Sequence, residues 1–230
     1  MKRRNILIGL GAVAAGAAAG AGYWLTRAPA PAPMAATGGD AAGTITLATA
    51  SGDMPLYDDD HILGAAAAPV TILEFSSLTC PHCANFHRGT LPEVKANWID
   101  SGRARLVYRH YPLDQLALRA AAVADCIKGD GFFGFLDVLF QNQDKWAQSQ
   151  DPLTAIQQFA ALAGLSPAAS EACMNDDAAI DRILRRQSEG RDKYNVASTP
   201  SFVVNGTPVV GGRSYEEFNT LLESAAAKAS

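Results

Sequence analysis

Two short segments of the chain have the hydrophobic pattern of strands in a buried sheet. Residues 70–75 form a run rich in β-branched, aliphatic and aromatic side chains. Residues 104–111 alternate between apolar and polar side chains before Pro112. Both patterns are typical of core strands. Residues 84–98 between them predict a helix. We expect Pro92 to kink or interrupt that helix, because proline lacks a backbone N–H and its ring crowds the preceding turn.

From about residue 115 to residue 195 the pattern is persistently helical, with no strand between the helices. Gly129-Asp130-Gly131 breaks the pattern once, and Asp151-Pro152 and Ser166-Pro167 each place an N-cap residue before a proline at the first helical position. About five helices are therefore expected, running over residues 116–128, 132–146, from 152, from 167, and from Asp176 or Asp177 toward Tyr194.

Strand character returns after Pro200. Residues 201–205 predict a short strand, Asn205-Gly206 is a strong hairpin signal, and residues 207–210 predict the partner strand. Ser214, with Glu216 and Glu217 behind it, is expected to cap a closing helix to about residue 228. The sequence thus predicts an α/β fold in which two halves of a small mixed sheet, residues 58–114 and 196–230, flank an inserted all-helical domain at 115–195.

The tetrapeptide Cys80-Pro81-His82-Cys83 lies where the first strand is expected to turn into a helix. A cysteine at a helix N-terminus faces unpaired N–H groups and the positive end of the helix dipole, which favours the reactive thiolate. We expect Cys80 at an exposed tip, Cys83 one turn inward, and a disulfide between them that exchanges with thiols through a mixed disulfide. A cationic His82 would add a second stabilising charge beside the Cys80 sulfur.

Metal sites and an inert surface disulfide are the alternatives for these side chains. Structural zinc needs a second ligand pair, whereas Cys126 and Cys173 stand 47 residues apart and the histidines form no paired motif. Residues 58–60 are three aspartates without the alternation of a calcium loop, so we expect a solvated acidic turn there. The sequence predicts no metal site and no bound cofactor.

The N-terminal segment predicts export. The first 36 residues contain four basic residues and no acidic one, and residues 6–25 are apolar, as in a signal peptide or a retained membrane anchor. Residues 37–57 are expected to form a low-complexity linker, with one short strand near 44–48. The rest of the chain has a formal net charge of −8, which argues against nucleic-acid binding. We therefore expect the globular part in an oxidising compartment, the periplasm.

Cys126 and Cys173 complete an even number of cysteines in a chain expected to be exported. A structural disulfide that joins two helices of the insertion is favoured, and two independent buried thiols are the alternative.

Residues 60–228 resemble a DsbA-type thiol:disulfide oxidoreductase of the thioredoxin superfamily. The resemblance rests on Leu73-Glu74-Phe75, on the Cys-Pro-His-Cys motif, on Ser198-Thr199-Pro200 far downstream, and on the helical segment between them. It implies a thioredoxin-like fold with a helical insertion.

The resemblance also implies roles for matching residues. Cys80 would be the nucleophile and Cys83 the resolving thiol, and Glu74 would be an acid beneath the disulfide that helps to move the proton of Cys83. Pro200 would be a cis-proline that turns the Thr199 backbone toward the sulfurs, where a substrate peptide pairs with it. Many DsbA enzymes have valine where this chain has Thr199, which also occurs in isomerase relatives and leaves the oxidising power open.

Three functions remain in competition. The resemblance favours an oxidase that donates its disulfide to unfolded exported proteins bearing thiols and is reoxidised by a DsbB-like, quinone-linked membrane partner. Substrates would bind in an apolar groove. A disulfide isomerase or reductase is the second reading, and a non-catalytic holdase is the third. His87, one turn after Cys83, is interpreted as part of a solvated helix face rather than of the active site.

Overall fold

A five-stranded mixed sheet forms the centre of the protein. The computed structural model describes residues 54–129 and 131–229, and the strand order is β1-β3-β2-β4-β5. The strands are β1 (His61–Gly64), β2 (Val70–Ser76), β3 (Ala104–His110), β4 (Ser201–Val204) and β5 (Thr207–Val210). Only the β2–β3 pair is parallel, and every other neighbouring pair is antiparallel. The thioredoxin-like α/β class expected from the sequence is confirmed.

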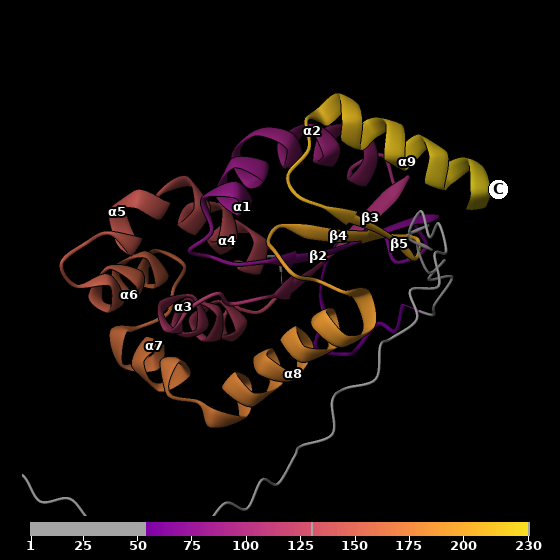
Figure 1. The fold of residues 1–230 in the computed structure, drawn as a ribbon. Helices are drawn as coiled ribbons and strands as arrows, with labels where there is room; N and C mark the ends of the chain where they lie inside the picture. The colour runs from indigo at the N-terminus through magenta and orange to yellow at the C-terminus, as the bar shows by residue number, and fades with distance from the viewer. Residues whose placement is uncertain (1–53, 130, 230) are drawn as a thin grey trace, which may run out of the picture. The chain divides into compact units, whose positions relative to one another are not determined.

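Strand β2 is buried on both faces, because helices cover both sides of the sheet. Ile72 and Phe202 pack on one face with residues of α9 (Tyr215–Ala229), while Leu73 and Phe75 pack on the other with Tyr194. Figure 1 shows α8 (Asp177–Tyr194) on the side of the sheet opposite α9. Side chains at odd and even positions of β2 therefore enter different cores.

The helix after β2 is continuous but irregular. It runs through α1 (Pro81–Asn85), the π-helical turn η1 (Phe86–Thr90), α2 (Leu91–Val94) and a second π-helical turn η2 (Lys95–Ile99). Pro92 lies at the start of α2, directly after η1. The wider turn accommodates a residue that has no N–H to donate, so the expected interruption takes the form of π-helical turns.

Six helices lie between β3 and β4 in the part of the chain that the structure describes. They are α3 (Gln115–Cys126), α4 (Gly131–Gln141), α5 (Gln143–Ala147), α6 (Pro152–Leu162), α7 (Pro167–Met174) and α8. The expected single helix over 132–146 is wrong, because the chain breaks at Asn142 and starts again as α5. The caps predicted at Asp151 and Ser166 are present, each side chain accepting from the backbone N–H three residues later.

The segment before β2 is more ordered than the sequence suggested. Strand β1 was not predicted, and the last residues of the expected linker pack on the domain: Met54 joins a core cluster, and Tyr57 lies under the Arg186 guanidinium, 3.2 Å from it. The Asp60 carboxylate is buried in an ion pair with Arg109 at 2.8 Å. The prediction of a solvated acidic turn is therefore wrong for Asp60. Contacts with two arginines of the folded domain hold this turn against the surface of the domain.

The expectations for residues 1–36 and for a strand near 44–48 lie outside the described residues. Among the described helices, none is both long enough and apolar enough to cross a membrane.

Candidate active site

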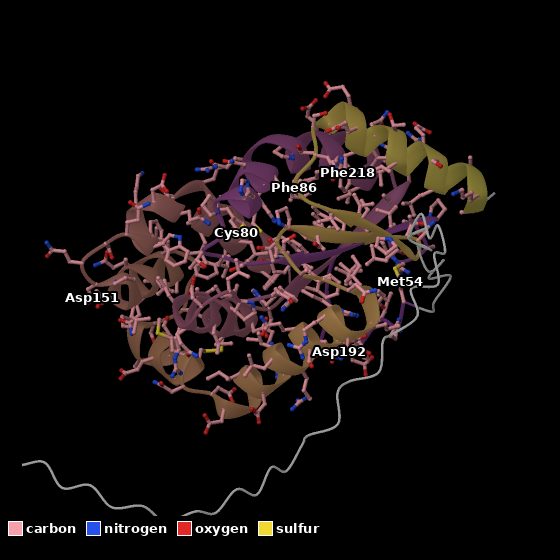
Figure 2. The ribbon with its side chains drawn as sticks, viewed as in Figure 1. Met54, Cys80, Phe86, Asp151, Asp192 and Phe218 are labelled. Atoms are coloured by element: carbon pink, nitrogen blue, oxygen red, sulfur yellow. A yellow bond between two sulfur atoms is a disulfide. The ribbon has the colours of Figure 1, made fainter. Side chains whose placement is uncertain are left out.

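Cys80 lies at the junction of β2 with α1 (Figure 2), and Cys83 follows in α1. Cys80 is the N-cap residue of α1, and Pro81 occupies its first turn. Both thiols are free, so the structure describes the dithiol form. Cys83 is fully buried, as expected, but the exposed tip predicted for Cys80 is wrong, because that residue is only 5% exposed. The loop before β4 covers it, and in its protonated form the Cys80 thiol donates to the Thr199 carbonyl at 3.3 Å.

The Cys80 thiol is strongly acidified. A hydrogen bond from the Cys83 thiol lowers the pKa of Cys80 to about 5, against the opposing effect of burial. The Thr199 side chain and the backbone N–H groups of Cys83 and His82 lower it further. His82 contributes through its backbone N–H at the helix N-terminus.

The pKa of the Cys83 thiol is shifted in the opposite direction. Burial raises the pKa of Cys83 far above that of an ordinary thiol, and the neighbouring Cys80 sulfur raises it further. The Ser76 side chain opposes this shift. At neutral pH the site therefore holds one thiolate, on Cys80, and one protonated thiol, on Cys83.

The loop before β4 faces the two sulfurs. The Thr199–Pro200 peptide bond is cis, the conformation that the resemblance implied. The Pro200 carbonyl accepts from the N–H of Gly211 at 2.9 Å, which ties this loop to the end of the β4–β5 hairpin. Ser201 donates to the Ser198 carbonyl at 2.7 Å and holds the loop from its other side.

Glu74 lies in the core beneath the active site. Its carboxylate is completely buried, and its Oε1 lies 2.9 Å from Nε2 of His87. The interpretation of His87 as a solvated residue is wrong, because helix α4 covers the turn that carries it: the His87 ring stacks on Phe140, with 4.1 Å between centroids. Sequence spacing alone does not reveal this cover, since α4 follows more than forty residues later.

Two further polar residues on this face of the sheet were missed. The Ser76 and Tyr108 hydroxyls are both buried, and neither makes a hydrogen bond of standard geometry. Glu74 and Tyr108 are partners in the β2–β3 register, and Ser76 lies two residues beyond Glu74 on the same face. The alternation of side chains along the two strands could have identified them, because even-numbered positions of both strands face the same core as Glu74.

Two hollows of about 270 Å³ each open on either side of the Cys-Pro-His-Cys turn. Around one are His82, Asn85, Phe86, Thr90, Gly212 and Arg213, and around the other are Thr79, Pro81, Asp114, Leu116, Gln143, Asp144, Ala147 and Gln148. The hollow on the His82 side of the turn is mainly polar, whereas the hollow on the Pro81 side is mainly apolar.

The remaining two cysteines form a structural crosslink. Cys126 at the end of α3 and Cys173 in α7 are joined in a disulfide, with 6.3 Å between their Cα atoms. Among the described residues, no group of three or more His, Cys, Asp or Glu side chains is arranged to hold a metal ion.

The same fold and sequence features occur in known proteins. A thioredoxin family model matches residues 57–224. A protein-disulfide oxidoreductase of Rickettsia felis is 32% identical over 170 residues, which are 73% of this chain and 60% of that relative. The chain thus spans less than two thirds of that relative's length. Disulfide bond formation protein D of Bacillus cereus is 28% identical over 162 residues, which cover 67% of this chain and 74% of that protein.

Among solved structures, α-DsbA1 of Wolbachia pipientis is 30% identical, with a TM-score of 0.73, and the match covers 79% of this chain and 98% of that one. The motif, the paired thiols and the cis-proline loop lie inside residues 57–224, the segment that the family model matches. The chain therefore belongs to the thioredoxin family and, within it, to the DsbA group.

Proposed function

We propose that the protein is a periplasmic dithiol oxidase that donates the Cys80–Cys83 disulfide to newly exported, unfolded proteins. The observation that carries the proposal is the unequal acidity of the two thiols. A Cys80 thiolate with a pKa of about 5 makes the reduced form favourable. A favourable reduced form makes the disulfide a strong oxidant.

The reaction follows from this asymmetry. A substrate thiolate attacks Cys80 Sγ of the disulfide, a substrate–Cys80 bond forms, and Cys83 leaves and takes a proton. The second substrate thiol loses its proton and attacks the substrate sulfur of the mixed disulfide, which releases the Cys80 thiolate. Two electrons pass to the protein, and of the two substrate protons one balances the proton on Cys83 and one goes to solvent.

The cis-proline loop supports a role in substrate binding. The Thr199 backbone faces Cys80 and lies two residues before strand β4. An extended substrate segment would pair with this backbone in the manner of an added strand, which accepts many sequences because it reads main-chain atoms.

Reoxidation requires an electron acceptor. We assign this step to a DsbB-like, quinone-linked membrane protein, and we place the enzyme in the periplasm, released or held by residues 6–25. The basic, apolar N-terminal segment supports this location.

The proposal is tested by mixing the oxidised protein with a reduced peptide that contains two cysteines, and by measuring its equilibrium with glutathione. The native protein is expected to form the peptide disulfide and to have a potential well above the about −270 mV of thioredoxin. The Cys80→Ser variant is expected to lose oxidation completely, and a Cys126→Ala/Cys173→Ala double variant serves as the control that keeps it. A potential near that of thioredoxin would point to a reductase, and full activity of Cys80→Ser would exclude the thiol mechanism.

A further inference from the structure

The two hollows beside the Cys-Pro-His-Cys turn differ in charge. The hollow on the His82 side is bordered by Arg213, and none of the described residues around it is acidic. The hollow on the Pro81 side is bordered by Asp114 and Asp144, and no basic residue is among the described residues that line it. A segment bound at the turn therefore lies next to positive charge on one side and next to negative charge on the other.

The backbone of Arg213 is held in place beside the active site. Arg213 lies in the loop between β5 and α9, where the Gly211 N–H donates to the Pro200 carbonyl at 2.9 Å. The Thr90 hydroxyl donates to the Arg213 carbonyl at 2.7 Å. A Cβ atom placed on Gly212 would lie 3.9 Å from Pro200 Cγ, so this loop packs on the cis-proline. The loop is thus joined both to the cis-proline loop and to the helix after β2.

The Arg213 guanidinium makes only long contacts within the protein. Its side chain is 42% exposed, with Nη1 3.9 Å from the Glu217 carboxylate and Nη2 3.3 Å from the Val210 carbonyl. Charge-assisted hydrogen bonds are shorter, at about 2.7–2.9 Å. Glu217 is engaged elsewhere, because it accepts the Ser214 N–H at 3.1 Å in the capping box that starts α9. A carboxylate from outside the protein would therefore find N–H donors of Arg213 that no close ion pair occupies.

A second arginine adds positive charge at the rim of the same hollow. Arg88 Nη2 donates to Asn85 Oδ1 at 3.0 Å, and Asn85 borders the hollow. This contact ties the Arg88 side chain to the His82 side of the turn. The positive potential there thus comes from two elements, the helix after β2 and the loop before α9.

The negative charge on the Pro81 side comes from two helix starts. Asp114 is the N-cap of α3 and also accepts from the Thr79 hydroxyl at 2.7 Å, so its carboxylate is fixed in place. Asp144 lies in the first turn of α5 and is exposed. Its Oδ1 accepts from the Gln148 amide at 3.5 Å, a long contact that leaves this carboxylate accessible to a partner.

Local charge and net charge predict opposite preferences for the His82 side. Residues 37–230 have a formal net charge of −8, which repels acidic segments at long range. Salt screens that repulsion over about 8 Å at physiological ionic strength, whereas it screens a contact pair in a hollow much less. The charges of the two hollows therefore dominate once a substrate segment is bound.

We propose that Arg213 and Asp144 are specificity-determining residues of the oxidation. Arg213 takes a carboxylate that flanks the reacting cysteine of the substrate, and Asp144 takes a basic side chain on the other side of that cysteine. This inference rests on the proposed function, since it states which cysteines the oxidase prefers. Preferred substrates carry charges of opposite sign before and after the reacting cysteine, in the order that the direction of the bound segment sets.

The experiment uses two reduced peptides of identical composition, each with two cysteines separated by a glycine spacer. One has a run of glutamates before the first cysteine and a run of lysines after it, and the other has the reverse order. Because their net charges are equal, the long-range field of the protein acts equally on both. Their rates with hydroxyethyl disulfide give the intrinsic reactivity of each peptide, by which the rates of opening the Cys80–Cys83 disulfide are divided.

The native protein is expected to react with one isomer about 3- to 10-fold faster than with the other, because one forms two exposed ion pairs and the other meets two repulsions. Arg213→Glu and Asp144→Lys are each expected to remove this preference, and Arg213→Gln to reduce it. The double variant Arg213→Glu/Asp144→Lys is expected to prefer the opposite isomer. Rates with dithiothreitol, which is uncharged, show separately whether a variant alters the disulfide itself.

Arg191→Glu is the matched control, because it changes the net charge as Arg213→Glu does but lies exposed on α8. It is expected to keep the native ratio of rates. Equal rates for the two isomers in the native protein, or a native ratio in the double variant, would overturn the inference. The same change of ratio in Arg191→Glu would also overturn it, since net charge would then be the cause.

The equilibrium with glutathione separates this inference from the proposed function. Equal isomer rates in a protein with a potential well above that of thioredoxin would overturn the inference and leave the oxidase standing. A potential near that of thioredoxin would refute the oxidase. The ratio of isomer rates would still decide the roles of Arg213 and Asp144 in that case, because it measures how substrate thiols reach Cys80.

Discussion

At the scale of single residues, the chemistry depends on a hydrogen bond between two thiols. Cys83 acts on Cys80 as a donor, and this bond is the largest cause of the low pKa of Cys80. The helix N-terminus, which the sequence pointed to, adds backbone N–H groups from His82 and Cys83. The direction of the shift was therefore predictable from the motif, but its main cause required the positions of both sulfurs.

The Cys83→Ala variant tests this cause. Removing the thiol donor is expected to raise the pKa of Cys80 from about 5 toward the value of about 8.5 for a free cysteine. The Cys83→Ser variant keeps a hydroxyl donor and is expected to shift the pKa less. Thiolate absorbance as a function of pH measures both, and a Cys83→Ala protein that still titrates near pH 5 would show that the helix N-terminus is sufficient.

His87 shows where reading the sequence fails at this scale. One turn after Cys83, its spacing is equally compatible with a surface and with a core position. Its burial is decided by Phe140 on α4, a helix of the segment between β3 and β4. The sequence position of Glu74, in contrast, indicated an unusual acid, because it interrupts an apolar strand, and the structure buries all seven positions of that strand.

At the scale of elements, helix α8 approaches the sheet through a glycine. A Cβ atom placed on Gly190 would lie 2.7 Å from the Phe75 ring on β2, closer than side chains come in folded proteins. The α8 helix therefore packs directly on the aromatic cluster of this sheet face. The cluster includes Phe75 and Tyr194, whose ring centroids are 5.7 Å apart.

The Gly190→Ala variant is expected to be destabilised by about 1–3 kcal/mol, because overpacking outweighs the gain in helix propensity. Gly134→Ala in α4 is the matched control: nothing lies within 4 Å of its Cβ position. That variant is expected to gain up to about 1 kcal/mol. Urea unfolding of both variants measures the difference. Equal stabilities would mean that the Phe75 ring moves aside without cost.

Helix ends were the most predictable elements, because capping is local chemistry. Asp151, Ser166 and Asp176 each accept backbone N–H groups as the sequence suggested. Strand β1 was not predictable in this way, since its pattern is short and its residues are only partly buried. It forms because β1 pairs over four residues with the edge of β3 that faces away from β2.

At the scale of the whole molecule, the Cys126–Cys173 disulfide joins α3 to α7 across a separation of 47 residues. Closing a loop of this size in the unfolded chain is expected to contribute about 4 kcal/mol in the chain-entropy model. The Cys126→Ala/Cys173→Ala variant should therefore lose about that free energy of unfolding, measured with urea, and still oxidise dithiols. A large loss of oxidation without a loss of stability would contradict a purely structural role.

The order of elements was predictable at this scale, and the sheet order was not. The alternation of strand, helix and hairpin signals gave the α/β class and the position of the helical segment. The order β1-β3-β2-β4-β5 depends on pairing between β2 and β4, which lie about 130 residues apart in the sequence, and on the β1 edge. No local pattern encodes such pairings.

That distance along the chain has a consequence for a protein that is synthesised from its N-terminus. The motif cysteines are made long before Thr199 and Pro200, which precede the strand that completes the sheet beside Cys80. Until about the last thirty residues are made, Cys80 lacks both the loop that covers it and the neighbouring strand β4. A chain truncated before β4 should thus leave Cys80 uncovered and able to exchange with any accessible disulfide.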